Sequence, residues 1–254
     1  MRIIRFKTQD TSPQYGWIRD GSVGVIHGDP FGEFRRFEET YELSEVNLLL
    51  PCLPSKIIAI GRNYREHAAE MKTDVPAYPL IFLKPPSALI TNGENIMLPP
   101  QSKRVEHEAE LAVVVGKRSR WLTKENALHS VFGYTIANDV TARDLQAADG
   151  QWSRAKGFDT FCPVGPWIET EFDPTDALIT CHVNNTLRQM SSTREMIFSI
   201  TQLMMYVSSI MTLEPGDLIL TGTPAGVGVL QAGDQVSVHI DGIGTLLNPV
   251  AAQG

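Results

Sequence analysis

One stretch constrains the fold more than any other, because it joins an apolar strand to a row of carboxylates. Residues 112–116 read Ala-Val-Val-Val-Gly, a β-branched run that predicts a short buried strand. Just before it stand Glu106, Glu108 and Glu110 at alternate positions. Side chains two residues apart on a strand share a face, so these carboxylates are expected to point the same way. Either a solvated sheet face or an oxygen-rich site for Mg²⁺, Mn²⁺ or Ca²⁺ explains such a pattern.

Composition excludes several classes of protein. The chain has 254 residues, 43% of them hydrophobic and 20% charged, and a formal net charge of -7 without any Lys/Arg block. We therefore expect no binding to nucleic acid or to an anionic membrane surface. No apolar run approaches the ~18 residues of a membrane span, and the first residues do not resemble a signal peptide. Three scattered cysteines, without metal-ligand spacing, suit a cytoplasmic protein.

The chain is predicted to divide into a small N-terminal part and a larger second part. Residues 1–52 indicate a small β-rich segment, with a hairpin expected where Asp20-Gly21 separates two alternating runs. Prolines near its end mark a boundary. Residues 53–254 are then the catalytic domain, against which the first segment packs as an appendage.

A histidine and a glutamate follow the next buried strand, at residues 56–61. Asn63 and Glu66 have the spacing of a capping box, which predicts the start of a helix. On that helix His67 and Glu70 are three residues apart and share a face. A carboxylate beside an imidazole orients the ring and favours its charged form, as in a general base, although a surface ion pair has the same pattern.

Two other charged residues lie where predicted strands end. Lys84 precedes two prolines that fix its position, and it is either an anion contact or a solvated lysine. Asp139 falls between an apolar strand and a helix, at the kind of junction where ligand-binding side chains gather. It is either the third carboxylate of a metal site or a helix-capping residue. Thr141 and Asp144 have the spacing of a second capping box.

The last third of the chain carries one more candidate loop. Residues 192–195 resemble a third capping box, and they are expected to open a helix whose apolar stripe runs to Met211. Residues 217–228 predict a strand that enters a glycine-rich loop. This loop lacks the ending of a P-loop and no helix pattern follows it. Its backbone N–H groups and the hydroxyls of Thr221 and Thr223 are suited to bind a carboxylate.

Over residues 54–250 these stretches together resemble the fumarylacetoacetate hydrolase family. The motifs occur in the family's order: Gly61-Arg62-Asn63-Tyr64 with His67 and Glu70, Phe82-Leu83-Lys84-Pro85, Glu108-Ala109-Glu110, Asn138-Asp139-Val140-Thr141-Ala142-Arg143-Asp144-Leu145-Gln146, Lys156-Gly157-Phe158, and Thr221-Gly222-Thr223-Pro224. Each is weak alone, but the set is specific. The resemblance implies an α+β, mainly β fold, with a rolled mixed sheet as its core and flanking helices, assembled as a homodimer.

The resemblance also implies a role for each matching residue. The acidic residues would bind one Mg²⁺ or Mn²⁺, with Ca²⁺ as a substitute in crystals: Glu108, Glu110 and Asp139. The catalytic residues would be His67 and Glu70, on a lid that orders over the substrate, together with Lys156. The remaining residues would contact the substrate, Thr223 through the substrate carboxylate: Arg62, Tyr64, Lys84, Gln146 and Thr223.

The expected chemistry centres on an enolate. A divalent ion with open positions binds a 2-oxo acid through its carboxylate and 2-oxo oxygen, and it stabilises the enolate formed there. We expect cleavage of a C–C bond in a short 2-oxo acid, by acylpyruvate hydrolysis with His67 as base or by oxaloacetate decarboxylation. The alternative is isomerisation or decarboxylation of 2-hydroxyhepta-2,4-diene-1,7-dioate-type acids in aromatic catabolism. A non-catalytic protein that binds small acids or metal is a further class, but it would have no need of the His67–Glu70 pair.

Overall fold

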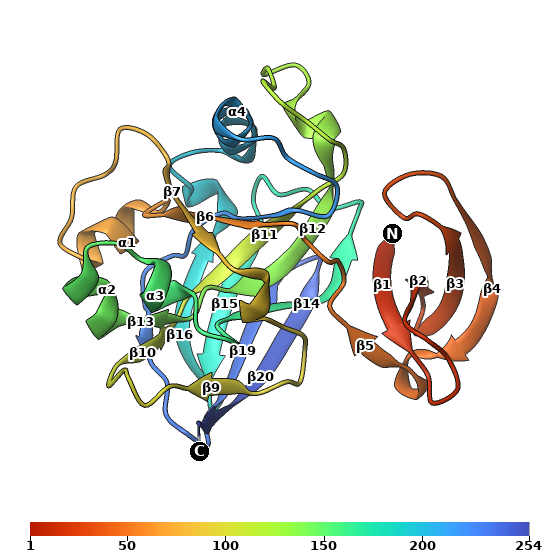
Figure 1. Ribbon diagram of the computed structural model, residues 1–254, viewed down its shortest axis with the longest axis horizontal. Coiled ribbons are helices and arrows are strands. Elements are labelled where there is room, and N and C mark those ends of the chain that lie inside the picture. Colours follow the sequence, from red (N-terminus) through yellow and green to blue (C-terminus); the bar gives the residue numbers. More distant parts are fainter. Residues whose placement is uncertain (254) are drawn as a thin grey trace.

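The structure, a computed structural model, describes residues 1–253 and is α+β and mainly β, as predicted (Figure 1). Its largest sheet has twelve strands, with ten in the order β4-β3-β2-β1-β14-β12-β11-β17-β6-β7. In addition, β5 pairs with β1 and β8 pairs with β14. The bounds of these strands are β1 (Arg2–Lys7), β2 (Gln14–Arg19), β3 (Ser22–Gly28), β4 (Phe34–Glu42), β5 (Asn47–Leu49), β6 (Ile57–Gly61), β7 (Leu80–Lys84), β8 (Leu89–Ile90), β11 (Ala109–Val115), β12 (Val131–Asn138), β14 (Cys162–Glu169) and β17 (Leu218–Leu220).

Two smaller sheets complete the β structure, with the orders β13-β10-β18 and β16-β15-β19-β20-β9. Their strands are β9 (Ile96–Leu98), β10 (Val105–His107), β13 (Thr141–Ala142), β15 (Leu178–Val183), β16 (Thr186–Ser192), β18 (Gly228–Val229), β19 (Gln235–Ile240) and β20 (Gly244–Ala252). The α-helices are α1 (Arg65–Glu70), α2 (Arg143–Asp149), α3 (Ser153–Lys156) and α4 (Ile200–Ile210), and the 3-10 turns are Leu43–Glu45, Pro86–Ala88, Ala127–Ser130 and Thr193–Glu195. Among residues 1–253, no helix is long and apolar enough to cross a membrane.

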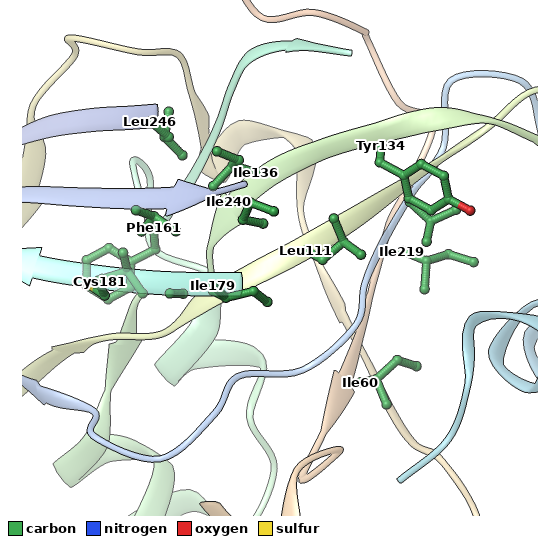
Figure 2. Packing of buried hydrophobic residues seen from close by; sticks show 14 of the residues in the cluster. Ile60, Leu111, Tyr134, Ile136, Phe161, Ile179, Cys181, Ile219, Ile240 and Leu246 are labelled. Carbon is green, nitrogen blue, oxygen red and sulfur yellow. The ribbon is translucent and has the colours of Figure 1, made fainter. Parts of the chain in front are cut away.

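The main core lies where the large sheet packs against the five-stranded sheet (Figure 2). Leu111 on β11 and Ile136 on β12 meet Ile179 on β15 and Ile240 on β19, and all four side chains are fully buried. Every residue of β11 is buried, which explains why its sequence is apolar except for Glu110. Burial of one such side chain stabilises the fold by about 1.5–3 kcal/mol. Glu108, just before β11, and Glu110, within it, are therefore attached to a fully buried strand.

The N-terminal strands extend the large sheet. β1 pairs antiparallel with β14, where Ile3 lies opposite Ile168, and β2 to β4 follow outward at the right of Figure 1. These strands also have an apolar cluster of their own, which includes Phe6 and Val23. The expected hairpin at Asp20-Gly21 joins β2 to β3. The segment is thus hydrogen-bonded to the rest of the fold, and the division at residue 52 stays a prediction.

The capping box expected at Asn63 is wrong. Helix α1 begins at Arg65 with Tyr64 as its N-cap. The amide nitrogen of Asn63 instead donates to the carbonyls of Phe198 and Thr221, and its oxygen accepts from the N–H of Phe198. Asn63 therefore ties the start of α1 to two distant segments, which is a tertiary use of a typical capping residue.

The other two capping boxes are also wrong. The carboxylate of Asp144 accepts a hydrogen bond from the Ser102 hydroxyl at 2.6 Å, and Ala142 is the N-cap of α2. Ser192 caps only a 3-10 turn. The long helix α4 starts later, where Ser199 and Gln202 form the capping box. Short polar side chains find partners through tertiary structure as readily as at helix ends. The spacing pattern alone therefore does not determine where a helix begins.

Candidate active site

Three carboxylates from two strand ends meet at one point. One oxygen from each of Glu108, Glu110 and Asp139 lies within 4.8 Å of those from the other two, and all three side chains are buried. The antiparallel pairing of β11 with β12 causes this, because it places Ala109 opposite Asn138. Residues about thirty positions apart in sequence therefore project their acids into the same space.

The expectation that Glu106 shares this face is wrong. Regular strand structure is interrupted at Glu108, which lies between β10 and β11, so Glu106 belongs to a different sheet. Its two oxygens pair with Arg104 Nε at 2.6 Å and Arg143 Nε at 2.7 Å. The break ends the simple alternation of a strand and removes Glu106 from the carboxylate cluster.

Two buried lysines contact the cluster. Lys156 Nζ lies 2.8 Å from Glu108 Oε2 and 2.6 Å from Asp139 Oδ2, and Lys84 Nζ lies 2.6 Å from Asp139 Oδ1. Burial works to lower the pKa of Lys156, but the neighbouring Asp139 and Glu108 carboxylates outweigh it and raise that pKa above its usual value. The ammonium group of Lys156 therefore stays charged inside the protein.

Arg143 completes the charge network, in which the pKa values of Glu108 and Glu110 are shifted in opposite directions. Its Nη2 lies 2.6 Å from Glu108 Oε1, and its Nη1 donates to Gln146 Oε1 at 2.7 Å. Burial works to raise the pKa of Glu108, but Lys156 and then Arg143 outweigh it and hold the pKa of Glu108 below its usual range. Burial, followed by repulsion from Asp139 and Glu108, raises the pKa of Glu110 well above its usual value.

The residues fit a divalent cation. Glu110 is 1% exposed, and its Oε2 accepts a hydrogen bond of 2.7 Å from the Gly222 N–H. Over residues 1–253 it forms no salt bridge, unlike Glu108 and Asp139. A buried carboxylate without a cationic partner is costly. Mg²⁺, Mn²⁺ and Ca²⁺ favour oxygen ligands, so Glu108, Glu110 and Asp139 form a donor set of the right chemistry.

His67 and Glu70 meet on one face of α1. His67 Nδ1 lies 3.1 Å from Glu70 Oε2, and His67 is 5% exposed. Glu70 also accepts a hydrogen bond of 3.1 Å from the backbone N–H of Gly226, in the glycine-rich loop. Because Nδ1 is engaged by Glu70, Nε2 is the ring nitrogen that is left for proton exchange.

One cavity is lined by most of the predicted site residues. These are Arg62, His67, Glu108, Glu110, Asp139, Gln146, Lys156 and Thr223. It lies on the side of the molecule where α1, α2 and α3 are drawn in Figure 1. Glu70, Tyr64 and Lys84 do not line it. Glu70 instead contacts His67, and Lys84 contacts Asp139. The hydroxyl of Tyr64 is buried without a hydrogen-bond partner in the described chain. The substrate contacts expected of Tyr64 and Lys84 stay predictions.

Three residues of the site were not predicted. Arg143 lines the cavity although it was named only as part of a motif. Trp152 adds an apolar wall, where its ring meets Phe82 edge-on at a centroid distance of 5.1 Å. Gln189, on β16, is buried and hydrogen-bonded to the strand and to the loop that form the site. A single glutamine in a hairpin strand gives no sequence pattern that would identify it.

Comparison with known proteins identifies the family. Residues 56–251 match the family described as "Fumarylacetoacetate (FAA) hydrolase C-terminal", and residues 1–51 match the one described as "Rv2993c-like, N-terminal". The chain belongs to the fumarylacetoacetate hydrolase family. Several of its relatives in that family are named as enzymes, and this protein is an enzyme of the same family.

Individual relatives are named for several reactions. The mitochondrial oxaloacetate tautomerase fahd2 of Xenopus laevis is 44% identical over 287 residues, covering 98% of this chain and 90% of its own. The structure of 5-carboxymethyl-2-hydroxymuconate delta-isomerase from Mycobacterium smegmatis is 44% identical and superposes with a TM-score of 0.92, covering 100% of both chains. Maleylpyruvate hydrolase of Sphingobium sp. SYK-6, in complex with manganese (II) ion and pyruvate, is 31% identical with a TM-score of 0.82 and also covers 100% of both chains.

Proposed function

We propose that this enzyme moves a proton beside the carbonyl of a short 2-oxo acid with two carboxylates, and that oxaloacetate represents this substrate class. The proposal rests on one observation: a histidine–glutamate pair and a set of carboxylates lie at the same cavity. His67, oriented by Glu70, and the carboxylate set Glu108, Glu110 and Asp139 line the same space or contact its lining. The relative named oxaloacetate tautomerase and the neighbour named delta-isomerase support a rearrangement of the substrate.

The carboxylate set would hold Mg²⁺ or Mn²⁺. A divalent cation bound there supplies Lewis acidity, drawing electron density from the oxygens of a 2-oxo acid. Lys156 and Arg143 keep Glu108 ionised, and Lys84 pairs with Asp139. The chain thus keeps Glu108 ionised, whereas burial and the neighbouring carboxylates raise the pKa of Glu110, which a bound cation would offset. The complex of the Sphingobium enzyme with manganese (II) ion supports the choice of metal.

The proton transfer itself falls to His67. Its free Nε2 takes a proton from C3 of oxaloacetate, and it returns the proton to the oxygen on C2, which converts the keto form into the enol. One C–H bond breaks and one O–H bond forms, so no oxidant or reductant takes part. Glu70 accepts from Nδ1 and stabilises the imidazolium while His67 holds the proton.

Arg62 is the residue suited to bind a second carboxylate of the substrate. It lines the cavity, and in the described part of the chain it forms no ion pair, whereas Arg143 and Lys156 are both paired with glutamates or aspartates. Its backbone has a φ of 58°, in the left-handed region that non-glycine residues rarely adopt. Such strain gathers at functional sites. A guanidinium fork matches a carboxylate, so Arg62 is suited to bind the one distant from the 2-oxo group.

Cleavage of a C–C bond is the second candidate. Hydrolysis of an acylpyruvate needs a base to activate water, and the His67–Glu70 pair supplies one. Simple decarboxylation of oxaloacetate needs no base, which makes it the less favoured cleavage. Isomerisation of 2-hydroxyhepta-2,4-diene-1,7-dioate-type acids would use the same proton transfer on a longer dicarboxylate. A homodimer and a cytoplasmic location also stay predictions, and the first is tested by light scattering.

The proposed function is tested by assaying metal-depleted enzyme after adding back Mg²⁺ or Mn²⁺. Enol formation, oxaloacetate loss and acetylpyruvate loss are followed side by side. A Glu108→Ala, Glu110→Ala double variant serves as the blank, because free Mn²⁺ itself decarboxylates oxaloacetate. Metal-dependent enol formation that His67→Ala abolishes supports the proposal. Acetylpyruvate loss with the same dependence would favour hydrolysis, and ligand binding without any turnover would indicate a binding protein.

A further inference from the structure

Gln189 links the two halves of the site and has no role in the steps above. It is 1% exposed. Its Oε1 accepts from the Ala109 N–H at 3.1 Å and lies 2.9 Å from His107 Nδ1. Its Nε2 donates to Thr223 Oγ1 and to the Pro224 carbonyl, both at 2.8 Å. A carboxamide has two donor hydrogens and two acceptor sites, so every hydrogen-bonding position of Gln189 is used.

Two backbone partners determine which end of the amide is the oxygen. The N–H of Ala109 only donates, and the carbonyl of Pro224 only accepts. A reversed amide would lose both hydrogen bonds, so the assignment of Oε1 and Nε2 is chemically determined. Nε2 therefore presents a hydrogen to Thr223 Oγ1, which must act as acceptor.

The Thr223 hydroxyl keeps its own hydrogen for another partner. In the described chain its Oγ1 contacts no hydrogen-bonding group other than Gln189. Thr223 is also 2% exposed and lines the cavity beside Glu110 and Lys156. A hydroxyl donates or accepts according to its surroundings, and only a donor suits an anionic ligand.

We infer that Gln189 is a positioning residue, which by donating to Thr223 Oγ1 directs the Thr223 hydroxyl hydrogen into the cavity, toward a carboxylate oxygen of the substrate. This inference rests on the proposed function, because it requires an anionic acid in the cavity. It assigns substrate affinity to an amide that does not touch the substrate. The same amide also holds Ala109, which lies between Glu108 and Glu110. This is a structural role, and the experiment must distinguish it from the effect on Thr223.

The test compares two substitutions of similar size by titration calorimetry, with oxalate as the probe at saturating Mg²⁺. In Gln189→Glu the new carboxylate can only accept, so it attracts the Thr223 hydrogen away from the cavity. Oxalate affinity should fall about tenfold to a hundredfold, as for a lost hydrogen bond to a charged group. In Gln189→Leu the hydroxyl is free to rotate, and the loss should be smaller. Gln189→Glu also loses the hydrogen bond to the Pro224 carbonyl, so the Thr223→Val background is needed to separate that structural damage from the effect on the hydroxyl.

A double variant makes the test independent of overall damage. Thr223→Val should weaken oxalate binding as much as Gln189→Glu does, and Thr223→Ser should bind nearly as the unmodified enzyme. In the Thr223→Val background, Gln189→Glu should cause no further loss, because the hydroxyl through which it acts is gone. Losses that multiply in the double variant would overturn the inference.

A crystal structure of the unmodified enzyme with Mg²⁺ and oxalate requires no variant to fold. Thr223 Oγ1 should lie within about 3 Å of an oxalate oxygen while it keeps its contact with Gln189 Nε2, and a separation above about 3.5 Å would overturn the inference. Oxalate binding without oxaloacetate turnover would refute the proposed function alone. Unchanged oxalate affinity in Gln189→Glu, with normal turnover by the unmodified enzyme, would refute this inference alone.

Discussion

Lys84 Nζ lies 2.6 Å from Asp139 Oδ1, and both side chains are almost completely buried. The pair joins the end of β7 to the end of β12, on opposite sides of the central strands of the large sheet. A buried ion pair is strongly destabilised when one member is removed, because the remaining charge has no compensation. Lys84 therefore shares with Lys156 the pairing of the buried Asp139 side chain, whether or not it contacts a substrate.

Replacing Lys84 by methionine should lower the free energy of unfolding by about 1.5–3 kcal/mol, because Asp139 loses one of its two buried lysine partners and keeps Lys156. Denaturant unfolding of metal-free protein measures the change. Lys117→Met is the matched control, since Lys117 is exposed and should tolerate the substitution. Equal stability of the two variants would show that Asp139 does not depend on Lys84.

Divalent metal should raise the melting temperature of the unmodified protein. At a free metal concentration one hundred times the dissociation constant, binding adds about 2.7 kcal/mol. Glu110→Gln should abolish this rise, and it should stabilise the metal-free protein by removing the repulsion from Asp139 and Glu108. Differential scanning calorimetry with and without Mn²⁺ gives both results. A Glu110→Gln variant that is less stable without metal would argue that Glu110 has another partner.

Arg62 should control the choice between dicarboxylates and monocarboxylates. Arg62→Gln is expected to raise the KM for oxaloacetate tenfold or more, while a substrate without a second carboxylate, such as acetylpyruvate, should be affected far less. Arg62→Lys keeps the charge and should retain part of the preference. Equal effects on both substrates would place Arg62 outside the substrate-binding set.

The His67–Glu70 pair should affect turnover more than binding. His67→Ala removes the base, and kcat for enol formation should fall by about 10²–10⁴. Glu70→Gln keeps the size of the side chain but removes the charge that stabilises imidazolium, so its effect should be smaller. Calorimetry with oxalate should show nearly unchanged affinity in both variants. Loss of oxalate binding in proportion to turnover would mean that the pair only shapes the cavity.

Buried thiols should make the protein sensitive to alkali. Burial raises the pKa of Cys52 and of Cys181 from 9.0 to about 12. The native state therefore keeps protons that the unfolded chain loses, so stability is full below about pH 9 and declines as the pH rises toward 12. At pH 10.5 each thiol should cost about 2 kcal/mol. Urea unfolding at pH 7 and pH 10.5 should show a smaller decline in Cys52→Ala, and an unchanged decline would exclude this cause.

The sequence identifies the candidate catalytic and metal-binding residues better than the residues that position them. Glu108 and Glu110 stand out because polar acids directly precede an apolar strand, and His67 and Glu70 stand out because helical spacing is local. Gln189 does not stand out, because its importance arises only when β16 packs beside β11 and the glycine-rich loop. The catalytic roles themselves stay predictions until variants are measured.

Local patterns misled where tertiary partners replaced local ones. Asn63 has the chemistry of a helix cap, yet its amide reaches Phe198 and Thr221. Glu106 follows the alternation of a strand, yet the break at Glu108 moves it into another sheet. In both cases the side chain kept its hydrogen-bonding chemistry and changed only its partner, which depends on contacts that no short stretch of sequence contains.

The hydrogen bond between Glu70 and the Gly226 N–H functions as an interlock. It fastens the helix that carries His67 to the loop that carries Thr223. If that helix swings away from the loop, Glu70 loses an anchor and His67 leaves the cavity in the same movement. A substrate could then be bound or released only while the base is disengaged. Under the proposed function, proton transfer would thereby be confined to the closed enzyme, which would shield a reactive enolate from solvent.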